Sequence, residues 1–534
     1  MHGSRGRVLV LGLIIALLAS GCGHRQRPQR AAAQATGPSG TFTYTTSSEV
    51  VTEWDPAPSY SNEIIAMSNL YETLTRYNPV TRKPEPLLAE SWTSSPDGKT
   101  WTFQLRQGVR FHTGRLLDAA AAKAAIERTI KLKQGAAYIW DPVASIDTPD
   151  SRTLVFHLKF PAPLDLNASA TYAAYLYDTQ AAGGGDLHKW FEQGRDAGTG
   201  PYTVEQWSKG KEFELTLKAF PGYWGGWSGH RFARVAFRVV REPTTAAQLL
   251  RAGQVSFVER LTPQLFDSFR NDPNVRLVTA PSWQNLLGLL NTKAGPLADA
   301  RVRQAISSAV DYQGTLAALK GAAVASSGVV PPGLWGHFDN LPSYQYDQAK
   351  AAALLKQAGY GPGGKPMHLT LTYTQGDSDE RVVATLLKST LAPLNVTVDI
   401  QSLVWETQWA KAKSSDPTKR QDILLFYWWP DYPDPYSWFI NLFHTESPPN
   451  FNLSYYSNPR LDAMMGRAEQ EAATNRDQAV QLYRQMQTML LSDAPALFLY
   501  NQNYQYAMLS SIDGFQVNPA YPNVVFVHDL QQRS

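Results

Sequence analysis

The sequence predicts an α/β protein, because segments with strand character alternate with segments of helical period in both halves of the chain. No segment recurs at a fixed spacing, which argues against a solenoid or a propeller. Of the 534 residues, 43% are hydrophobic and 18% are charged, so the chain can bury a large core. Its length allows about two to four packed units.

The first 21 residues are predicted to be a signal peptide and not part of the fold. Arg5 and Arg7 precede an apolar run over residues 8–19, which is too short for a comfortable membrane span. Small residues and then Cys22 follow, as in the lipobox of bacterial lipoproteins, with Ala19 where Leu is usual. Cys22 is the only cysteine of the chain, so we expect acylation there and no disulfide.

Residues 22–39 are predicted to form a flexible tether, since they are rich in Arg, Gln, Ala and Pro and show no apolar period. No later stretch reaches about 18 apolar residues, so we expect no second membrane segment. The formal charge of +3 includes Arg5 and Arg7, so the mature chain is close to neutral. This balance does not favour nucleic acid as a partner.

Strand-like and helical segments follow the tether. Residues that alternate in polarity, or are β-branched and aromatic, predict strands over 41–45, 100–105, 153–158, 213–217 and 235–240. Helical spacing, with an Asp at several N-cap positions, predicts helices over 118–133, 299–312, 347–357, 379–391, 459–473 and 476–491. Gly- and Pro-rich stretches predict surface loops at 183–185, 328–336 and 361–366.

Two glycine-containing segments predict chain reversals. Asp97 and Gly98 lie between two tryptophans, which is typical of a hairpin turn flanked by cross-strand aromatic residues. Gly198 and Gly200 are expected to adopt positive φ before a strand that starts at Tyr202. The latter segment lacks the spacing and the Lys of a phosphate-binding loop.

Five sequence blocks, in order along the chain, carry a resemblance to a known family. They are residues 54–56 with 69–74, 86–92 with 101–114, 198–202 with 223–225, 290–292 with 302–306, and 428–435 with 456–459. With these blocks the chain resembles family 5 of the solute-binding proteins of bacterial ABC importers, which take up oligopeptides, dipeptides or nickel. The resemblance extends over residues 44–527.

The resemblance implies a periplasmic-binding-protein-like clamshell of two lobes, with an extra subdomain inserted into the first lobe. Lobe I would combine residues 40–66, 197–280 and 498–534, the inserted subdomain would be residues 67–196, and lobe II would be residues 281–497. The chain would cross between the lobes near residues 280–281 and 497–498. A few residues at such crossings can absorb closure, so they would form the hinge.

In peptide binders of this family, the Asp of a Trp-x-x-Asp-Tyr motif pairs with the α-ammonium of the ligand, which implies this role for Asp431. A buried carboxylate is costly until a cation arrives, so such a pocket favours ligands that carry an amine. The structural alternative is that Asp431 stabilises a turn before Pro433. Asp434 is expected to be structural.

Three further sets of residues are expected to contact the ligand. Aromatic walls beside Asp431, and at a position where the family often has a pocket aromatic, would come from Trp428, Trp429, Tyr432 and Trp405. A loop that pairs with peptide backbone in the relatives corresponds to Ser59, Tyr60, Ser61 and Asn62. Additional candidates, for which core packing is the alternative, are Tyr138, Trp140 and Tyr500.

The identity of the ligand is left open between several classes. Peptide binders of the family often carry an Arg for the ligand's carboxylate, but the strand 423–427 has none, and Arg260 is a candidate for that role. An oligosaccharide is an alternative that the 15 Trp would suit, and a metal–chelator complex or haem is a third. No nucleophile elbow, zinc-protease motif or Walker motif is present, so we expect neither catalysis nor a resident cofactor.

The resemblance also implies partners and a location. The partners would be a small ligand and the permease and ATPase subunits of an ABC importer. The protein would act at the extracytoplasmic face of the cell membrane, anchored by a lipid at Cys22. A monomer is expected.

Overall fold

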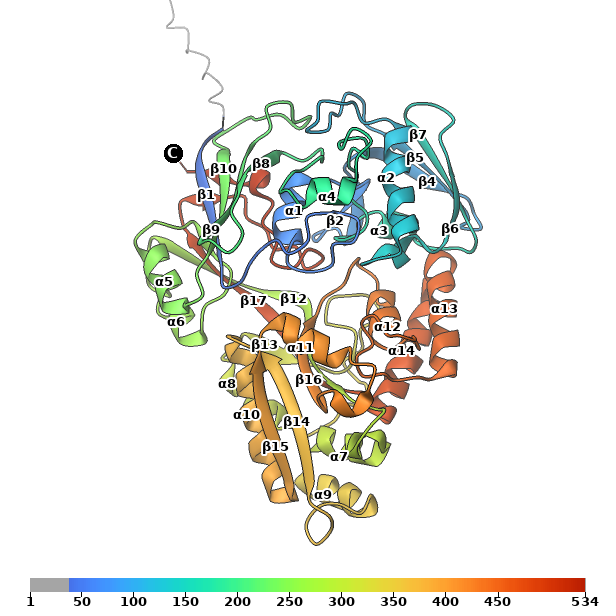
Figure 1. Ribbon diagram of the computed structural model, residues 1–534, viewed down its shortest axis with the longest axis vertical. Helices are drawn as coiled ribbons and strands as arrows, with labels where there is room; N and C mark the ends of the chain where they lie inside the picture. The colour runs from blue at the N-terminus through green and yellow to red at the C-terminus, as the bar shows by residue number, and fades with distance from the viewer. Residues whose placement is uncertain (1–37, 534) are drawn as a thin grey trace, which may run out of the picture.

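The computed structural model describes residues 38–533, so the predicted signal peptide, Cys22 and most of the predicted tether lie outside the described residues. Figure 1 shows two bodies stacked along the long axis of the molecule. We call residues 38–274 and 510–533 the upper body, and residues 291–495 the lower body. Strands β12 (Val275–Leu290) and β17 (Ala496–Leu509) pass between them. Within this part of the chain, no helix has the length and hydrophobicity to span a bilayer.

Among the described residues, one eleven-stranded sheet runs through both bodies. β12 and β17 pair antiparallel over most of their length in the middle of it. Toward the lower body follow β16 (Ile423–Trp428), β14 (Met367–Thr374) and β15 (Val396–Leu403), and β13 (Ala323–Ala325) pairs with β17. Toward the upper body follow β11 (Phe257–Val258), β1 (Ser39–Thr46), β10 (Phe232–Val239), β9 (Phe213–Ala219) and β8 (Tyr202–Trp207).

The upper body also contains smaller sheets and short helices. A four-stranded antiparallel sheet is formed by β4 (Ala89–Ser94), β5 (Thr100–Leu105), β7 (Thr153–Leu158) and β6 (Val143–Asp147). Two-stranded pairs are β2 (Thr75–Asn78) with β3 (Lys83–Pro86), and β18 (Ile512–Asp513) with β19 (Gln531–Gln532). The helices are α1 (Ile64–Leu70), α2 (Ala119–Leu132), η1 (Ala137–Trp140), α3 (Leu164–Asn167), α4 (Leu187–Phe191), α5 (Pro243–Arg251), α6 (Pro263–Asp267) and η5 (Val527–Asp529).

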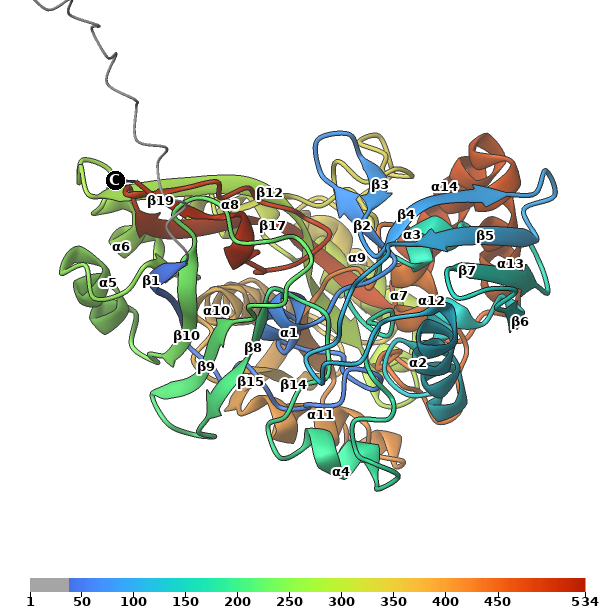
Figure 2. The same cartoon turned by 90° about the horizontal axis from the view of Figure 1, so that it is seen from above.

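The four-stranded sheet shows why these residues form strands. In β5, Trp101, Phe103 and Leu105 are buried while the residues between them are more exposed, which is the period of two of a strand with one covered face. The predicted turn at Gly98 joins β4 to β5, and Gly98 has a φ of +65°. Figure 2 shows this sheet at one end of the upper body, with β1, β10 and β9 at the other end.

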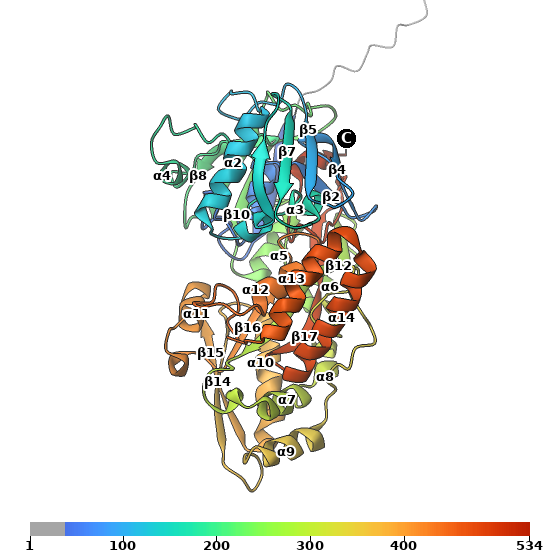
Figure 3. The same cartoon turned by 90° about the vertical axis from the view of Figure 1, so that its right-hand side faces the viewer.

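The lower body is formed mostly by helices around β14, β15 and β16. Its helices are η2 (Pro296–Ala298), α7 (Ala300–Ser308), α8 (Tyr312–Ala318), α9 (Gln348–Gln357), α10 (Ser378–Leu391), η3 (Ala392–Leu394), α11 (Trp405–Ala412), η4 (Pro417–Lys419), α12 (Tyr436–Leu442), α13 (Pro459–Thr474) and α14 (Arg476–Asp493). The predicted Asp N-caps are confirmed at Asp299 and Asp347, whose side chains accept hydrogen bonds from the first helical turn. The helix predicted over 379–391 begins one residue earlier, and Asp377 caps it. Figures 1 and 3 place α13 and α14 directly below the four-stranded sheet.

Two predictions about local structure are wrong. The helix predicted over 299–312 ends at Ser308, because Asp311 accepts a hydrogen bond from the Gly314 N–H and so begins the separate helix α8. Gly198 and Gly200 do not have positive φ. They are required for another reason: a Cβ at Gly198 would lie 2.0 Å from the Leu70 carbonyl oxygen, so only glycine permits this close approach of two chain segments.

Candidate functional site

Asp431 lies in the loop between β16 and α12, where its contacts with Tyr138 and Thr171 join the lower body to the upper body. Its side chain is 8% exposed. Three groups donate to the carboxylate oxygen Oδ2: the Tyr138 hydroxyl at 2.7 Å, the Asn441 amide at 3.0 Å and the Ser437 hydroxyl at 3.4 Å. Ser437 and Asn441 lie one turn apart on α12, so both reach back to the preceding loop, whereas Tyr138 belongs to the upper body.

The electrostatic environment of Asp431 is unusual for a carboxylate. Burial raises the pKa of Asp431 from its usual 3.8 to about 6, and the hydrogen bonds from Tyr138, Asn441 and Ser437 oppose that rise. Among the described residues, no basic side chain forms an ion pair with Asp431. The site therefore contains a desolvated negative charge, stabilised by neutral donors alone, that a cation would neutralise.

The upper body also holds the main chain of the loop that carries Asp431. The Thr171 N–H and hydroxyl donate to the Asp431 carbonyl at 2.8 Å and 3.1 Å. The Trp429 indole N–H donates to the Tyr172 hydroxyl at 3.1 Å. Tyr172 in turn donates to the Ser61 carbonyl at 2.7 Å, which connects the loop of Asp431 to the predicted peptide-pairing loop.

A cluster of five aromatic rings crosses the junction beside this loop. Phe451 is at its centre, with ring centroids 5.3 Å from Trp428, 5.7 Å from Trp409 and 5.9 Å from Tyr60 of the upper body. Trp405 stacks against Trp409 at 5.1 Å. The structure therefore brings three predicted residues, Trp428, Trp405 and Tyr60, into one aromatic cluster, and Tyr60 remains 43% exposed.

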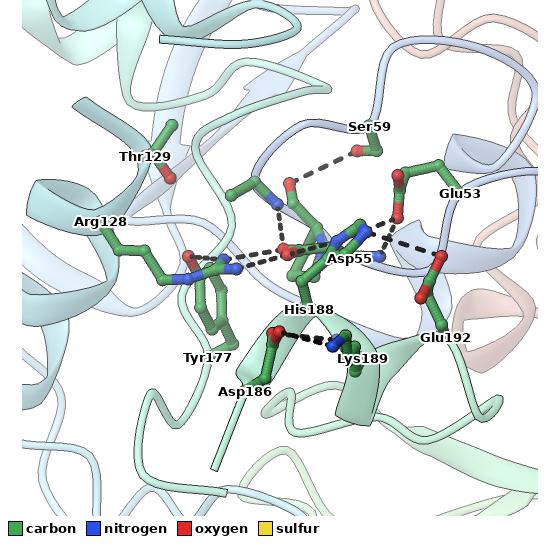
Figure 4. Close-up of polar contacts among 12 residues, drawn as sticks. Glu53, Asp55, Ser59, Arg128, Thr129, Tyr177, Asp186, His188, Lys189 and Glu192 are labelled. Carbon is green, nitrogen blue, oxygen red and sulfur yellow. Dashed lines mark hydrogen bonds and ion pairs between the residues drawn. The ribbon is translucent and has the colours of Figure 1, made fainter. Parts of the chain in front are cut away.

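Figure 4 shows the polar network that fixes the start of the loop containing Ser59 to Asn62. Asp55 is fully buried, and the two terminal nitrogens of the Arg128 guanidinium donate to its two carboxylate oxygens. The His188 ring lies 3.2 Å from the same carboxylate, and Arg128 also donates to the Tyr177 hydroxyl at 3.0 Å. This two-point contact holds the chain rigidly just before the candidate loop.

The loop itself uses part of its hydrogen-bonding capacity internally. The N–H groups of Tyr60 and Ser61 donate to the Glu63 carboxylate at 2.8 Å and 3.0 Å. Burial raises the pKa of Glu63, and these backbone bonds oppose that rise. Asn62 donates to Ser48 at 3.4 Å, and the Ser59 side chain is fully buried. Any pairing of this loop with a ligand backbone would thus compete with Glu63.

The remaining candidates lie in packed surroundings. Trp140 is 1% exposed, and its N–H donates to the Ala173 carbonyl at 2.8 Å, which favours a structural role. Tyr432 is 2% exposed, with its ring 6.4 Å from that of Tyr138. Asp434 accepts from Tyr483 and from a backbone N–H, in agreement with its predicted structural role.

Tyr500 and Arg260 meet at a second contact between the bodies. The Tyr500 and Tyr427 hydroxyls are 3.0 Å apart, and the Arg260 guanidinium lies 5.2 Å from the centroid of the Tyr427 ring. Arg260, from the upper body, forms an ion pair of 2.8 Å with Asp377 at the start of α10. Arg260 is therefore committed to a protein carboxylate in this arrangement, and its role toward a ligand carboxylate stays a prediction.

Two cavities lie elsewhere in the protein. One of about 50 Å³ is inside the upper body, beside Tyr71, Glu72 and Arg76, and one of about 380 Å³ is at the surface, beside Lys211 and Arg241. Asp431 lines neither of them. Over residues 38–533, no three His, Cys, Asp or Glu side chains gather as they would around a metal ion.

Sequence reasoning missed four partners of this site: Ser437, Asn441, Thr171 and Tyr172. The first two had a local signal, because polar residues four apart on the helix after the motif face the same side. Thr171 and Tyr172 come from a distant segment of the upper body, and nothing near them in the sequence indicates that they contact residues 429–431.

The family model described as bacterial extracellular solute-binding proteins, family 5 Middle, matches residues 83–450. The chain belongs to this family. Family 5 solute-binding proteins bind small solutes outside the cytoplasm and deliver them to ABC transporters, and this solute-binding protein shares that general role. The predicted family and the general function of solute binding are thus confirmed.

Curated relatives cover most of this solute-binding protein. It is 30% identical to the probable D,D-dipeptide-binding periplasmic protein DdpA of Escherichia coli (strain K12), over 83% of this chain and 84% of the relative. It is 28% identical to the glutathione-binding protein GsiB of Salmonella typhimurium, over 82% of this chain and 84% of the relative.

A solved structure confirms the predicted fold class. The periplasmic binding protein DppA from Helicobacter pylori, in complex with the peptide STSA, superposes with a TM-score of 0.81 at 23% identity, over 93% of this chain and 99% of that protein. The two bodies of Figure 1 are therefore the two lobes of a periplasmic-binding-protein-like clamshell.

Proposed function

We propose that this solute-binding protein captures short peptides between its two bodies and delivers them to an ABC permease, without catalysing a reaction. The observation that carries the proposal is Asp431: a carboxylate that is 8% exposed, lies at the junction of the bodies and has no basic partner among the described residues. This position fits a residue that pairs with a positive charge on the ligand.

The α-ammonium of a peptide would satisfy this carboxylate. Desolvating an unpaired charge is unfavourable, and a charge-assisted hydrogen bond in a dry site compensates for that cost. A neutral ligand such as an oligosaccharide would leave the charge of Asp431 uncompensated. The aromatic cluster around Phe451 would then pack against apolar parts of the peptide.

The names of the curated relatives support the same class of ligand. DdpA is named for D,D-dipeptides and GsiB for glutathione. Both kinds of molecule carry a free α-ammonium group, although they differ in stereochemistry and in side chains. What they have in common is the group that Asp431 is proposed to bind.

We infer that the lobes have the predicted boundaries, with lobe I at 40–66, 197–280 and 498–534, its inserted subdomain at 67–196 and lobe II at 281–497. The register between β12 and β17 shifts between Pro281 and Asn285, next to the first predicted crossing. A break in the ladder leaves fewer hydrogen bonds to resist bending, which supports a hinge there. Closure would bring Tyr138 and Tyr172 to the loop of Asp431.

Peptide binding is tested best with a pair of ligands that differ only at the amino end. Titration calorimetry should show that a dipeptide or tripeptide with a free amino end binds. Its N-acetylated form should bind with an affinity lower by at least about a hundredfold. Native mass spectrometry of the protein from its own host identifies the carried ligand. Equal affinity for the two forms, or a co-purified oligosaccharide, would contradict the proposal.

We also propose that a lipid at Cys22 anchors the protein to the outer face of the cell membrane. The support is the predicted signal peptide that ends directly before this cysteine. Cells that express the Cys22→Ser variant should release the protein from the membrane fraction and incorporate no labelled palmitate into it. Membrane retention of this variant would show that another anchor operates.

A further inference from the structure

Tyr138 is the one hydrogen-bond donor to the Asp431 carboxylate that comes from the other body, among the described residues. It lies on η1 of the upper body, whereas Ser437 and Asn441 lie on α12 of the lower body, beside Asp431 itself. The bond is the shortest of the three, at 2.7 Å. The amide of Asn441 also donates to the Tyr138 hydroxyl at 3.1 Å, so the tyrosine is held in place by a lower-body group.

The three donors use one carboxylate oxygen. All of them reach Oδ2, and no described residue donates to Oδ1. A carboxylate whose one oxygen is fixed presents the other in a defined direction, ready for an incoming donor. Tyr138 therefore does not occupy the position at Oδ1 that a ligand would use.

The same body fixes the main chain of the loop as well. Thr171 bonds the Asp431 carbonyl, and Tyr172 accepts from Trp429, so separation of the bodies removes these contacts together with the bond from Tyr138. The complete arrangement around Asp431 thus exists when the bodies are together.

We propose that Tyr138 is a positioning residue that links closure of the two bodies to the ionisation and orientation of Asp431. This inference rests on the proposed function of Asp431 as the ammonium-binding group. In the open protein, Asp431 would keep only the donors of its own body. On closure, Tyr138 adds a donor that favours the negative form at the moment when the ligand cation is enclosed.

No cation in the part of the chain that the structure describes lowers the pKa of Asp431 itself. From the lower body, the titratable groups in its surroundings are Tyr432, Tyr436, Asp434 and Glu469, and from the upper body they are Tyr138, Tyr172, Glu63 and Asp141. All of these are acids or phenols, and the cations among their own neighbours, Arg476 near Asp434 and Lys133 and Lys159 near Asp141, act on those two carboxylates. Burial raises the pKa of Glu469 to about 8 and that of Asp434 to about 6, so these acids also favour the neutral form when dry. Neutral donors such as Tyr138 are therefore the means by which this site stabilises a negative Asp431.

The first test follows Asp431 directly in the ligand-free protein, in which Tyr138 donates to Asp431 whenever the two bodies are together, as they are in this structure. The carboxyl carbon of Asp431 is titrated by NMR in protein labelled with ¹³C-aspartate, and its signal is assigned by its loss in Asp431→Asn. Tyr138→Phe should raise the pKa of Asp431 further above about 6, because a donor to the charged form is removed. Tyr77→Phe is the matched control, since Tyr77 packs on Trp283 across the junction, at 5.5 Å, and does not touch Asp431.

The second test measures peptide affinity as a function of pH. Near pH 6.5, Tyr138→Phe should bind about tenfold or more weakly than the wild type, and the gap should narrow as the pH rises and Asp431 ionises. Tyr77→Phe should follow the wild type at every pH. The inference would be overturned if Tyr138→Phe lost the same peptide affinity at all pH values, or if the titration of Asp431 were unchanged in this variant. If the titration of Asp431 shifts in Tyr138→Phe but neither the wild type nor the variants bind peptide, the proposed ligand would be refuted and the role of Tyr138 would stay supported.

Discussion

Replacing Asp431 with Asn is expected to abolish high-affinity peptide binding and to make the ligand-free protein more stable. The amide cannot pair with an ammonium, and loss of one partner of a buried charge pair costs about 2–5 kcal/mol, or roughly thirtyfold to several thousandfold in affinity. Titration calorimetry near pH 7.5 measures this loss.

The gain in stability follows from the pKa of the carboxylate. Burial raises it from 3.8 to about 6, so the folded state binds the proton more tightly than the unfolded chain. The resulting penalty is absent below about pH 3.8, grows as the pH rises, and is complete above about pH 6, where it amounts to about 3 kcal/mol. Urea unfolding of ligand-free Asp431→Asn should therefore show higher stability at pH 7.5 and little difference near pH 4.

Asp434→Asn is the matched control for both measurements. Asp434 lies three residues further on, is also buried, at 1% exposure against 8% for Asp431, and has its pKa raised to about 6 by that burial. Its Oδ1 accepts hydrogen bonds from Tyr483 and from the Tyr436 N–H within the lower body, so we assign it no contact with the ligand. Asp434→Asn should keep peptide affinity. Equal losses of affinity in the two variants would show that Asp431 is not the specific anchor.

Replacing Asp55 with Ala is expected to destabilise the protein by about 3–5 kcal/mol, because it leaves the Arg128 guanidinium without its buried partner. The carboxylate is fully buried and Arg128 is 19% exposed, so solvent cannot easily replace the lost contact. Urea unfolding measures the effect. Peptide affinity should fall as well, because this network fixes the chain just before the loop of Ser59 to Asn62.

Lys189→Ala provides the comparison, because Lys189 lies beside the Asp55 network in Figure 4 but is not bonded to it. The ion pair of Lys189 with Asp186 is 3.8 Å long, with side chains 76% and 53% exposed. Exposed pairs of this kind contribute about 0–1 kcal/mol, so the variant should unfold almost as the wild type does. If the two variants lost the same stability, the buried pair of Asp55 and Arg128 would not hold the loop as we infer.

The elements that local sequence patterns predicted lie near their observed bounds, apart from the helix over 299–312, but many elements of the structure were not predicted. The strand over 100–105 and the helix over 118–133 are confirmed, because each carries a clear period and a clear start or stop signal. The central strands β12 and β17 were among the elements that were not predicted. The last five residues of β12, Leu286–Leu290, form a continuous apolar run buried on both faces, and the rest of the strand contains Pro281 and polar residues, so β12 shows no alternation over its length. The residues of β14 alternate in polarity, so the same criterion of alternation could have predicted this strand.

The motif around residue 431 identified the central carboxylate of the site but did not indicate which groups surround it. Sequence resemblance selected Asp431, and the structure places Tyr138, Trp429 and Tyr60 at the same junction. It also moves Trp140 into the core of the upper body. Whether a predicted aromatic residue faces a ligand or the core depends on packing between segments that are tens to hundreds of residues apart, 33 for Trp140 and Ala173 and 293 for Tyr138 and Asp431, which no local period reports.

The sequence by itself determined the α/β class, the family, the carboxylate at residue 431 and the turn and cap residues, because these depend on residue type and on neighbours within a few positions. Only the tertiary structure decided which groups satisfy that carboxylate. A hydrogen bond is set by distances of about 3 Å. Tyr138 and Asp431 are 293 positions apart in the sequence and come to such a distance only when both bodies have folded and met.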